Sequence, residues 1–325
     1  MGITEIYDVQ QFSEYITVPM TAETDSSITT SSLYEHALGA YLGFACGDAL
    51  GATLELMTPE QIQESYGVHQ DIIGGGWLGL PQGHVTDVTE MTLTLSQAII
   101  DAQGWDIKVA ADYFVIWLSK HPTDISDAVL RGIRRYKNTG DLVAPYDDHD
   151  AGNDACCRVL PLALICLFRD DVCEHWLHEQ NHFTHHNSLS DRASQMLGCM
   201  IRRLIRQESD EAELTLTEFI EKDPEFAFSP YPGHSSGYIV DTIQTVLHFF
   251  HTTDNLEDCV IKTVNMGGDA NTVGALAGMM AGAKYGVKAI PERWLKQLDS
   301  DVYQQITDQT STLLSLAEKL AAQNE

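Results

Sequence analysis

NMGGDANTVGALAG, residues 265–278, is an unusual start for a helix. Asp269, Asn271 and Thr272 bring oxygen atoms to its first turn, and the glycines and alanines behind them are too small to fill a core. Glycine inside a helix costs about 1 kcal/mol relative to alanine, so such a row needs a compensating contact. The pattern predicts a helix whose glycines let another backbone approach closely.

Two rows of glycines with a four-residue period occur in the chain. Because residues four apart lie on the same side of a helix, each row lines one helix face. The rows are Gly39, Gly43, Gly47 and Gly51, and Gly274, Gly278, Gly282 and Gly286. We expect these two helices to pack closely at the centre of the fold. Asp48, Glu55 and Lys284 interrupt them with charge, which excludes a pair of membrane spans.

Helical periodicity continues through the rest of the chain, and convincing period-two strands are absent. Helices are predicted at 89–102, 106–120, 125–138, 159–168, 190–207 and 236–252, with a closing pair over 294–321. The sequence therefore predicts an all-α fold, a single compact domain of many helices around the two glycine-rich ones. That domain spans 32–325 and begins with a capping box of Ser32 and Glu35, after a polar N-terminal extension over 1–31.

Composition narrows the classes of function. The chain has 325 residues, 44% of them hydrophobic, and a formal net charge of −28. Such an acidic balance excludes a groove-reading nucleic-acid protein, which needs clustered Lys and Arg. Seven cysteines scattered through apolar segments favour reduced thiols and a cytoplasmic location. No signal peptide and no run long enough to span a membrane is evident.

Oxygen-bearing side chains concentrate at predicted helix starts. Glu55 follows the first glycine-rich helix, TDVT occupies 86–89, and DANT occupies 269–272. Mg²⁺ and Mn²⁺ prefer carboxylate, hydroxyl, carbonyl and water oxygens. Each motif alone is also typical of helix N-capping. Since two close-packed helices bring distant loops together, the combination favours a metal site.

Several loops, in the same order along the chain, resemble the signatures of the ADP-ribosylglycohydrolase family. They are GAYLGFACGDALGATLE (39–55), GGGWLGLPQGHVTDVTEMTL (74–93), AGNDACCRVLP (151–161), THHN (184–187), SSGYIVDT (235–242) and MGGDANTVGALAGMMAGAKYG (266–286). The likeness runs from about Ser32 to near residue 318. It implies an all-α fold, a binuclear Mn²⁺ or Mg²⁺ centre, and hydrolysis of the N-glycosidic bond between ADP-ribose and a protein arginine. It also implies an ADP-ribosylated protein or an ADP-ribose-like ligand, and a PII-type signalling protein, as partners.

The metal motifs depart from the family pattern. The family reads T-D-D-T and G-G-D-x-D-T, whereas here Val88 and Asn271 replace one aspartate in each motif. Valine offers no ligand and asparagine offers a neutral oxygen. The resemblance leaves these metal-ligand candidates: Glu55, Thr86, Asp87, Asp269, Asn271 and Thr272. With two carboxylates missing, one Mg²⁺ or Mn²⁺ ion is favoured over two, and no ion is the alternative.

The resemblance also implies catalytic and substrate-binding residues. The catalytic candidates are Glu55, Asp87 and Asp124, and the substrate-binding candidates are Gly152, Asn153, Asp154, His185, Ser235, Ser236 and Tyr238. Asp154 replaces a glycine of the family's G-N-G loop, so its bulk and negative charge are expected to weaken binding of a pyrophosphate. The alternatives are a helix cap for Asp124, an ordinary loop residue for His185 and a core position for Tyr238.

Three functions stay open on the sequence. The first is hydrolysis of ADP-ribosylated arginine with one ion or a rearranged pair. The second is a non-catalytic family member that binds a protein partner, ADP-ribose or a related nucleotide. The third is a structural or storage role. The departures at Val88, Asn271 and Asp154 all fall in the predicted site, so weak or lost hydrolysis is expected.

Overall fold

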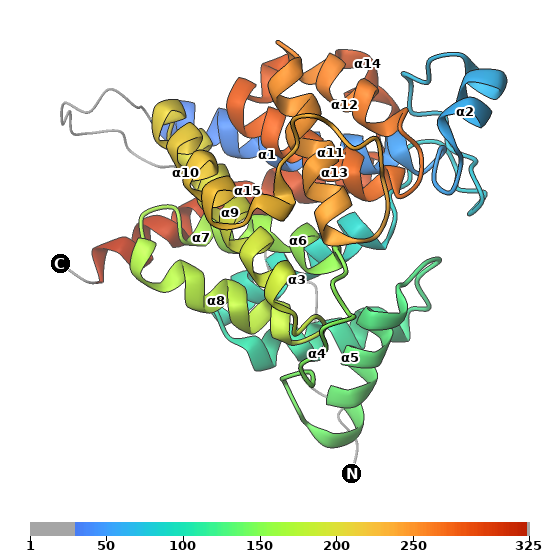
Figure 1. The fold of residues 1–325 in the computed structure, drawn as a ribbon. Coiled ribbons are helices and arrows are strands. Elements are labelled where there is room, and N and C mark those ends of the chain that lie inside the picture. Colours follow the sequence, from blue (N-terminus) through green and yellow to red (C-terminus); the bar gives the residue numbers. More distant parts are fainter. Residues whose placement is uncertain (1–29, 324–325) are drawn as a thin grey trace.

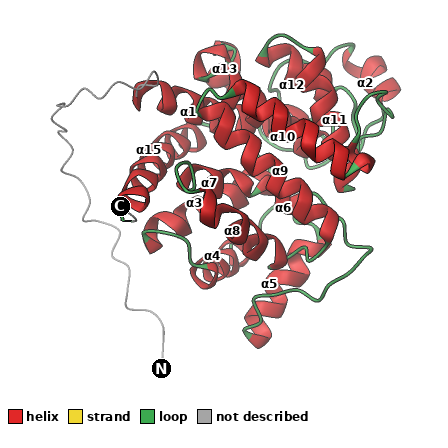
Figure 2. Cartoon of the chain, turned by 60° about the vertical axis from the view of Figure 1, so that its left-hand side comes forward, coloured by secondary structure: helices red, strands yellow, loops and turns green. Residues whose placement is uncertain are grey.

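The structure, a computed structural model, describes residues 30–323. Within that range the chain is helical and contains no β-strand, as predicted (Figure 2). Isolated β-bridges join Gly75 to Leu80 and Gly152 to Tyr238. No described helix combines the length and apolarity that a membrane span requires. All seven cysteines are free thiols, and the predicted N-terminal extension lies almost wholly outside the described residues.

The helices follow one another along the chain with short connections, and two of them are single 3₁₀ turns. In order they are α1 (Thr30–Gly51), α2 (Pro59–Tyr66), α3 (Asp87–Ala102), α4 (Ile107–Ser119), α5 (Asp127–Thr139), α6 (Asp154–Cys157), α7 (Val159–Ile165), α8 (Asp170–His182), α9 (Ser188–Ile205), α10 (Ser209–Lys222), η1 (Pro224–Phe226), α11 (Ile239–Thr252), α12 (Leu256–Val264), α13 (Ala270–Tyr285), η2 (Val287–Ala289), α14 (Glu292–Gln297) and α15 (Ser300–Ala322).

Helices α1 and α13 carry the two glycine rows, except for Gly286, which is the C-cap of α13, and they pack against each other inside the molecule (Figure 1). A Cβ atom added at Gly47 would lie 2.0 Å from the carbonyl oxygen of Gly274, and one added at Gly278 would lie 2.0 Å from that of Gly43. Such distances leave no room for a side chain, so the backbones themselves are in contact. The predicted packing of the two glycine-rich helices is confirmed.

Helix α1 begins at Thr30, so Ser32 is its third residue. The predicted N-cap at Ser32 and its capping box with Glu35 are therefore wrong. Glu35 instead pairs with Lys288, with 2.8 Å between Oε1 and Nζ. Because several adjacent Ser and Thr residues can each begin a helix, the motif did not locate the first turn.

Two glycines of the turn before α13 position the loops at one end of the central helices. Gly267 and Gly268 have φ values of 66° and 62°, which glycine adopts without strain. A Cβ on Gly268 would lie 1.9 Å from the Ser235 carbonyl oxygen, and one on Gly267 would lie 2.0 Å from that of Met57. The turn thus lies directly on the segments that follow α1 and precede α11, and it places Asp269 beside them.

Candidate active site

The loops that carry the predicted site residues line one cavity of about 560 Å³. Its lining consists of Glu55, Leu56, Trp77, Asp87, Val88, Asp124, Ser126, Ala128, Asp150, Gly152, Asn153, Asp154, His185, Ser235, Ser236, Gly237, Gly268, Asp269, Asn271 and Thr272. Of the residues predicted for the site, Thr86 and Tyr238 are not among those that line it. The structure therefore brings the other predicted residues together in one place.

Asp48 of α1 holds the first turn of α3, and the sequence did not identify it as a site residue. Its buried carboxylate accepts hydrogen bonds from Thr86 Oγ1 (2.8 Å) and N (3.0 Å), and from Thr89 Oγ1 (2.6 Å) and N (3.2 Å). Burial raises the pKa of Asp48 to about 6, although these bonds lower it. Thr86 also caps α3 by accepting from Val88 N. The position of Asp48 within a glycine-rich helix could have indicated this role, because a buried carboxylate needs hydrogen-bond donors around it.

Two buried oxygen groups, in the first turns of α3 and α13, have no hydrogen-bond donor among the described residues. One is the Asp87 carboxylate, whose pKa is held well above its usual value by burial and by the negative charges of Asp154 and Asp124. The other is Asn271 Oδ1, while Asn271 Nδ2 donates to Thr86 Oγ1 at 3.3 Å. Buried polar groups without partners are uncommon, so both are candidates for contact with a cation or water.

The Asp269 and Glu55 carboxylates each accept one hydrogen bond from a neutral side chain. Asn153 Nδ2 donates to Asp269 Oδ2 at 2.6 Å, and Trp77 Nε1 donates to Glu55 Oε2 at 2.8 Å. The pKa of Glu55 is raised to about 7, mainly by burial and in smaller part by the charge of Asp269, while the Trp77 bond acts to lower it. Trp77 was not among the residues predicted for the site, since its contact with Glu55 depends on the path of a glycine-rich loop.

The donor groups of the cavity can be compared with those that a metal ion requires. Val88, 7% exposed, presents only a hydrocarbon surface to the cavity. Among residues 30–323 no three His, Cys, Asp or Glu side chains come close enough to enclose an ion by themselves. The unpartnered oxygens of Asp87 and Asn271 are nevertheless ligands that a hard cation accepts. The cavity therefore offers oxygen donors to a divalent ion completed by water, and the number of ions stays a prediction.

Asp154 faces the cavity as a charged group. Its Oδ2 lies 3.1 Å from His185 Nε2 and accepts a hydrogen bond of 3.1 Å from Ser126 Oγ. Burial by itself raises the pKa of Asp154, but His185 and the charge of buried Arg158 hold it below its usual value. Gly152 leaves room for the imidazole, because a Cβ there would lie 2.7 Å from His185 Nε2. His185 is thus a buried cavity residue and not an ordinary loop histidine.

The surroundings of Asp124 and Tyr238 also argue against the alternatives for them, a helix cap for Asp124 and a core position for Tyr238. Ser126, not Asp124, caps α5 by accepting from Val129 N at 3.3 Å. Asp124 lines the cavity, and burial raises its pKa. Tyr238 is 45% exposed, so it is not a core residue, and its β-bridge to Gly152 places it next to the cavity.

Ser235 and Ser236 use their hydroxyl protons within the protein. Ser235 Oγ donates to the Gly267 carbonyl oxygen at 2.9 Å, and Ser236 Oγ donates to Asp241 Oδ2 at 2.6 Å. Ser236 Oγ also accepts from Tyr238 N at 3.2 Å. Their predicted role in substrate binding stays a prediction.

The electrostatic character of the cavity is strongly acidic. Six carboxylates line it: Glu55, Asp87, Asp124, Asp150, Asp154 and Asp269. No lysine or arginine is among the lining residues. Such a cavity attracts a guanidinium group and repels a pyrophosphate unless a cation enters with it.

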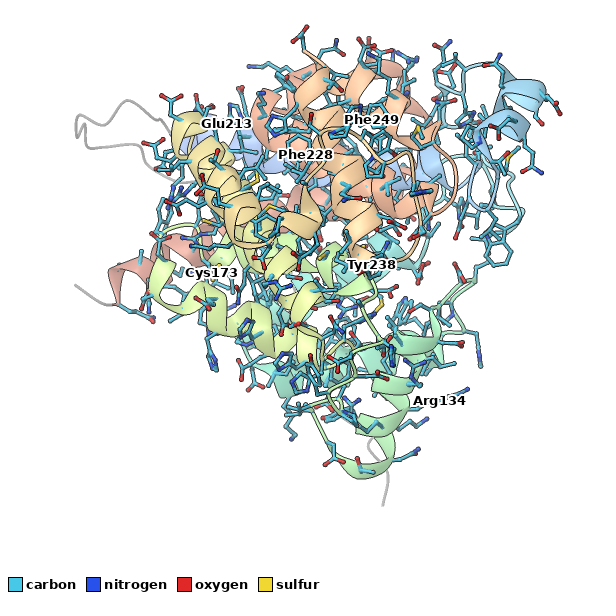
Figure 3. All side chains as sticks on the ribbon, viewed as in Figure 1. Arg134, Cys173, Glu213, Phe228, Tyr238 and Phe249 are labelled. Atoms are coloured by element: carbon cyan, nitrogen blue, oxygen red, sulfur yellow. The ribbon has the colours of Figure 1, made fainter. Side chains whose placement is uncertain are left out.

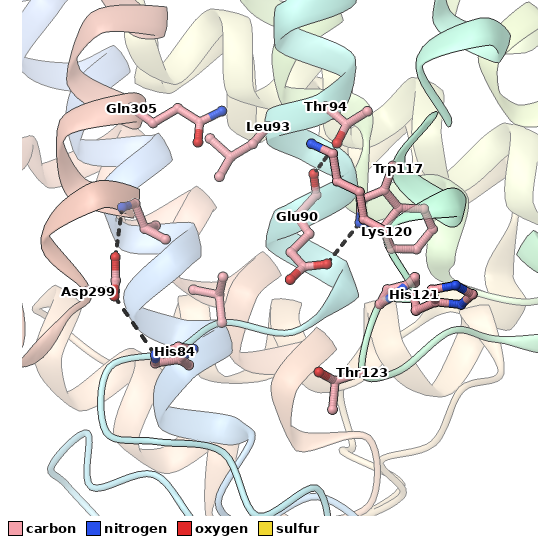
Figure 4. Close-up of a pocket in the computed structure, with 13 residues that line it drawn as sticks. His84, Glu90, Leu93, Thr94, Trp117, Lys120, His121, Thr123, Asp299 and Gln305 are labelled. Carbon is pink, nitrogen blue, oxygen red and sulfur yellow. Dashed lines mark hydrogen bonds and ion pairs between the residues drawn. The ribbon is translucent and has the colours of Figure 1, made fainter. Parts of the chain in front are cut away.

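Another cavity, of about 440 Å³, lies between α3, α15 and the loop after α4 (Figure 4). Its polar contacts include a hydrogen bond from Trp117 Nε1 to Glu90 Oε2 at 2.8 Å and an approach of 3.9 Å between His84 and Asp299. None of the residues predicted for the site lines it. The acidic cavity is therefore the candidate active site.

Comparison with known proteins agrees with the resemblance of the motifs. A family model described as ADP-ribosylglycohydrolase matches residues 29–325. The motifs resemble those of the bacterial dinitrogenase reductase-activating glycohydrolase. The chain is 46% identical to the ADP-ribosyl-dinitrogen reductase glycohydrolase of Rhodospirillum rubrum, covering 89% of this chain and 99% of that one.

Two further matches extend this comparison. The ADP-ribosylarginine hydrolase Tri1 of Serratia proteamaculans is 29% identical over 83% of this chain and 77% of its own length. A solved structure described as an ADP-ribosylglycohydrolase-related protein complex superposes with a TM-score of 0.77 at 30% identity, covering 88% of this chain and 99% of that one. The likeness thus extends over nearly all of the described residues.

Proposed function

The chain belongs to the ADP-ribosylglycohydrolase family, and from this premise we propose that its acidic cavity recognises ADP-ribose linked to a protein arginine, with weak or no hydrolysis of the N-glycosidic bond. One observation carries the proposal. Val88 and Asn271, which replace two anionic ligands of the family pattern, line the same cavity as Asp87 and Asp269. The losses therefore fall together in one cavity instead of being scattered over the fold.

The residues of the cavity support distinct roles in binding. The acidic lining, including Asp124, suits the positively charged guanidinium of the modified arginine. The exposed ring of Tyr238 is available for stacking on adenine. Asn153 holds the Asp269 carboxylate in position through its bond of 2.6 Å. These residues account for recognition without requiring that the bond be cleaved.

A divalent ion would be held by Asp87, Asp269, Glu55 and the neutral oxygens of Asn271 and Thr272. When bound, such an ion offsets the carboxylates and supplies Lewis acidity. Glu55 is the group that would accept a proton from an attacking water, since Trp77 occupies only one of its carboxylate oxygens. Val88 would offer no ligand to such an ion.

A non-catalytic role in binding a protein partner is the second candidate. The rim of the cavity carries exposed apolar side chains, with Leu56 68% exposed and Trp77 54% exposed. Exposed apolar groups beside a cleft are typical of a surface that a protein covers. A PII-type signalling protein as that partner is an expectation from the resemblance.

Titration with Mn²⁺ tests the number of ions. We expect at most one tight site per chain in calorimetry at neutral pH, because Val88 removes one ligand and Asn271 weakens another. The variant Asp87→Asn should lose that site, since the unpartnered carboxylate is its strongest donor. Two tight sites in the unaltered chain would contradict the proposal.

ADP-ribose binding should be limited by the charge of Asp154. The variant Asp154→Asn keeps the size of the side chain and removes the charge, so binding should tighten by about fivefold, equivalent to roughly 1 kcal/mol of relieved repulsion. Calorimetric titration with ADP-ribose measures the change. Asp154→Gly provides a comparison in which the contacts with His185 and Ser126 are also lost. An unchanged dissociation constant in both variants would show that Asp154 does not oppose the pyrophosphate.

A further inference from the structure

A separate cavity of about 330 Å³ lies between helices α8 and α9. In a chain with a net charge of −28, its lining is unusual because it contains Arg202, Arg203 and Arg206. None of its lining residues belongs to the active-site cavity. Cys173, from its α8 wall, lies well apart from Tyr238 in Figure 3.

Arg202 is the buried member of this arginine cluster. Its side chain is 5% exposed, and its Nε has no hydrogen-bond partner among the described residues. Burial lowers the pKa of Arg202 to about 10, and the charges of Arg206 and Arg203 lower it too. The guanidinium therefore stays charged at neutral pH with an unsatisfied N–H group, which is unfavourable unless an anion compensates it.

The acid that contacts Arg202 comes from the surface. Asp170 Oδ1 contacts Arg202 Nη2, yet the Asp170 side chain is 79% exposed. Such an exposed carboxylate can turn into solvent at little cost in free energy. Asp170 therefore occupies a position that a free anion can take.

The two neighbouring arginines are held in place by other groups. Arg203 donates to the Glu211 carbonyl oxygen and to Thr215 Oγ1, and it forms no ion pair with a described residue. Arg206 donates to the Leu167 carbonyl oxygen at 2.9 Å and pairs with Glu208 at 2.8 Å, and its Nη1 lies 3.9 Å from Asp170 Oδ1. The cluster is thus fixed before any ligand arrives. Its three arginines are matched by Asp170, Glu208 and the lining residue Glu174, so an excess of positive charge arises when the exposed Asp170 side chain turns into solvent.

We propose that this cavity binds a small phosphate anion, either free or as the monoester of a small metabolite, and that Asp170 occupies the anion position in its absence. The planar guanidinium of Arg202 can donate to two phosphate oxygens at once. A volume of about 330 Å³ suits a ligand of this size. The site is independent of the acidic cavity and of its proposed function.

Calorimetric titration at constant ionic strength, with inorganic phosphate in one arm and ribose 5-phosphate in the other, tests the proposal. We expect binding to the unaltered chain, and a loss of about tenfold or more in Arg202→Gln, because a hydrogen bond to a charged group is removed. Asp170→Asn should bind several-fold more tightly, because the competing carboxylate is gone. Arg134→Gln is the matched control, since it removes the same charge from an exposed position on α5.

The two arms separate the sources of the phosphate group, since a metabolite site binds the ester more tightly and a free-phosphate site does not. The absence of binding of both ligands by the unaltered chain and by Asp170→Asn would overturn the proposal. Equal effects of Arg202→Gln and Arg134→Gln would also overturn it. If Arg202→Gln does not fold, as judged by circular dichroism, Asp170→Asn decides, because unchanged or weaker binding in that variant contradicts the site.

Discussion

The double variant Val88→Asp with Asn271→Asp is expected to release ADP-ribose from a modified arginine peptide in the presence of Mn²⁺ at least about 100-fold faster than the unaltered chain. Both positions line the cavity with Asp87 and Asp269, so the new carboxylates should complete the ligands for a second ion. Lewis-acid stabilisation contributes several kcal/mol to the transition state, and each 1.4 kcal/mol is about tenfold in rate.

Each single reversion should achieve much less than the double variant. A new carboxylate without a bound ion adds repulsion to a group of acids whose pKa values are already raised, such as Asp87 and Glu55. The two changes should therefore be strongly non-additive, as expected for groups that share one site.

The assay needs a control for the added charge. Val143→Asp with Asn255→Asp introduces the same residue types at exposed positions away from the cavity, and it should leave the rate unchanged. If the unaltered chain already releases ADP-ribose as fast as the double reversion, a one-ion mechanism replaces the proposed loss of activity.

The central helices were predictable because their signal is local. A glycine every fourth residue marks a helix face for close contact, and α1 and α13 meet along those faces. Other helices gave weaker signals. Helix α8 (Asp170–His182) has charged and histidine residues on much of its surface, and α12 (Leu256–Val264) is short. Tertiary packing, more than periodicity, decides such segments.

Helix α10 (Ser209–Lys222) was not predicted, although its sequence has apolar residues at helical spacing. Its buried residues Ala212, Leu216 and Phe219 recur at helical spacing between acidic side chains. Acidic and threonine residues around them reduce the difference in hydrophobicity between the two faces of the helix. A narrow apolar stripe of this kind is sufficient for a helix at the surface of a domain.

For the candidate site, the sequence identified residues within motifs but not the contacts between motifs. Asp87, Asp154 and Asp269 were predicted from their motifs, and all three line the cavity. The hydrogen bond from Trp77 to Glu55 and the buried charge of Arg158 beside Asp154 were not predicted. These contacts join residues that the chain brings together only on folding, so no local spacing encodes them.

Gly47→Ala is expected to lower the free energy of unfolding by about 3 kcal/mol, although alanine favours helices. The added methyl would lie 2.0 Å from the Gly274 carbonyl oxygen, a backbone atom of a buried helix that cannot turn away. Helices α1 and α13 must therefore separate. Because α1 carries Asp48 and α13 carries Asn271, the separation should also weaken Mn²⁺ binding.

Gly198→Ala is the matched control for this change, since Gly198 also lies within a helix. Its added methyl would meet Leu177 Cδ1 at 2.7 Å, and this is the end of a flexible side chain that can move. Urea unfolding should therefore show a change within about 1 kcal/mol for Gly198→Ala, against the larger loss for Gly47→Ala. Equal stability of the two variants would mean that the glycine rows are not held in backbone contact, and the loops at the ends of α1 and α13 would then need another explanation for their convergence.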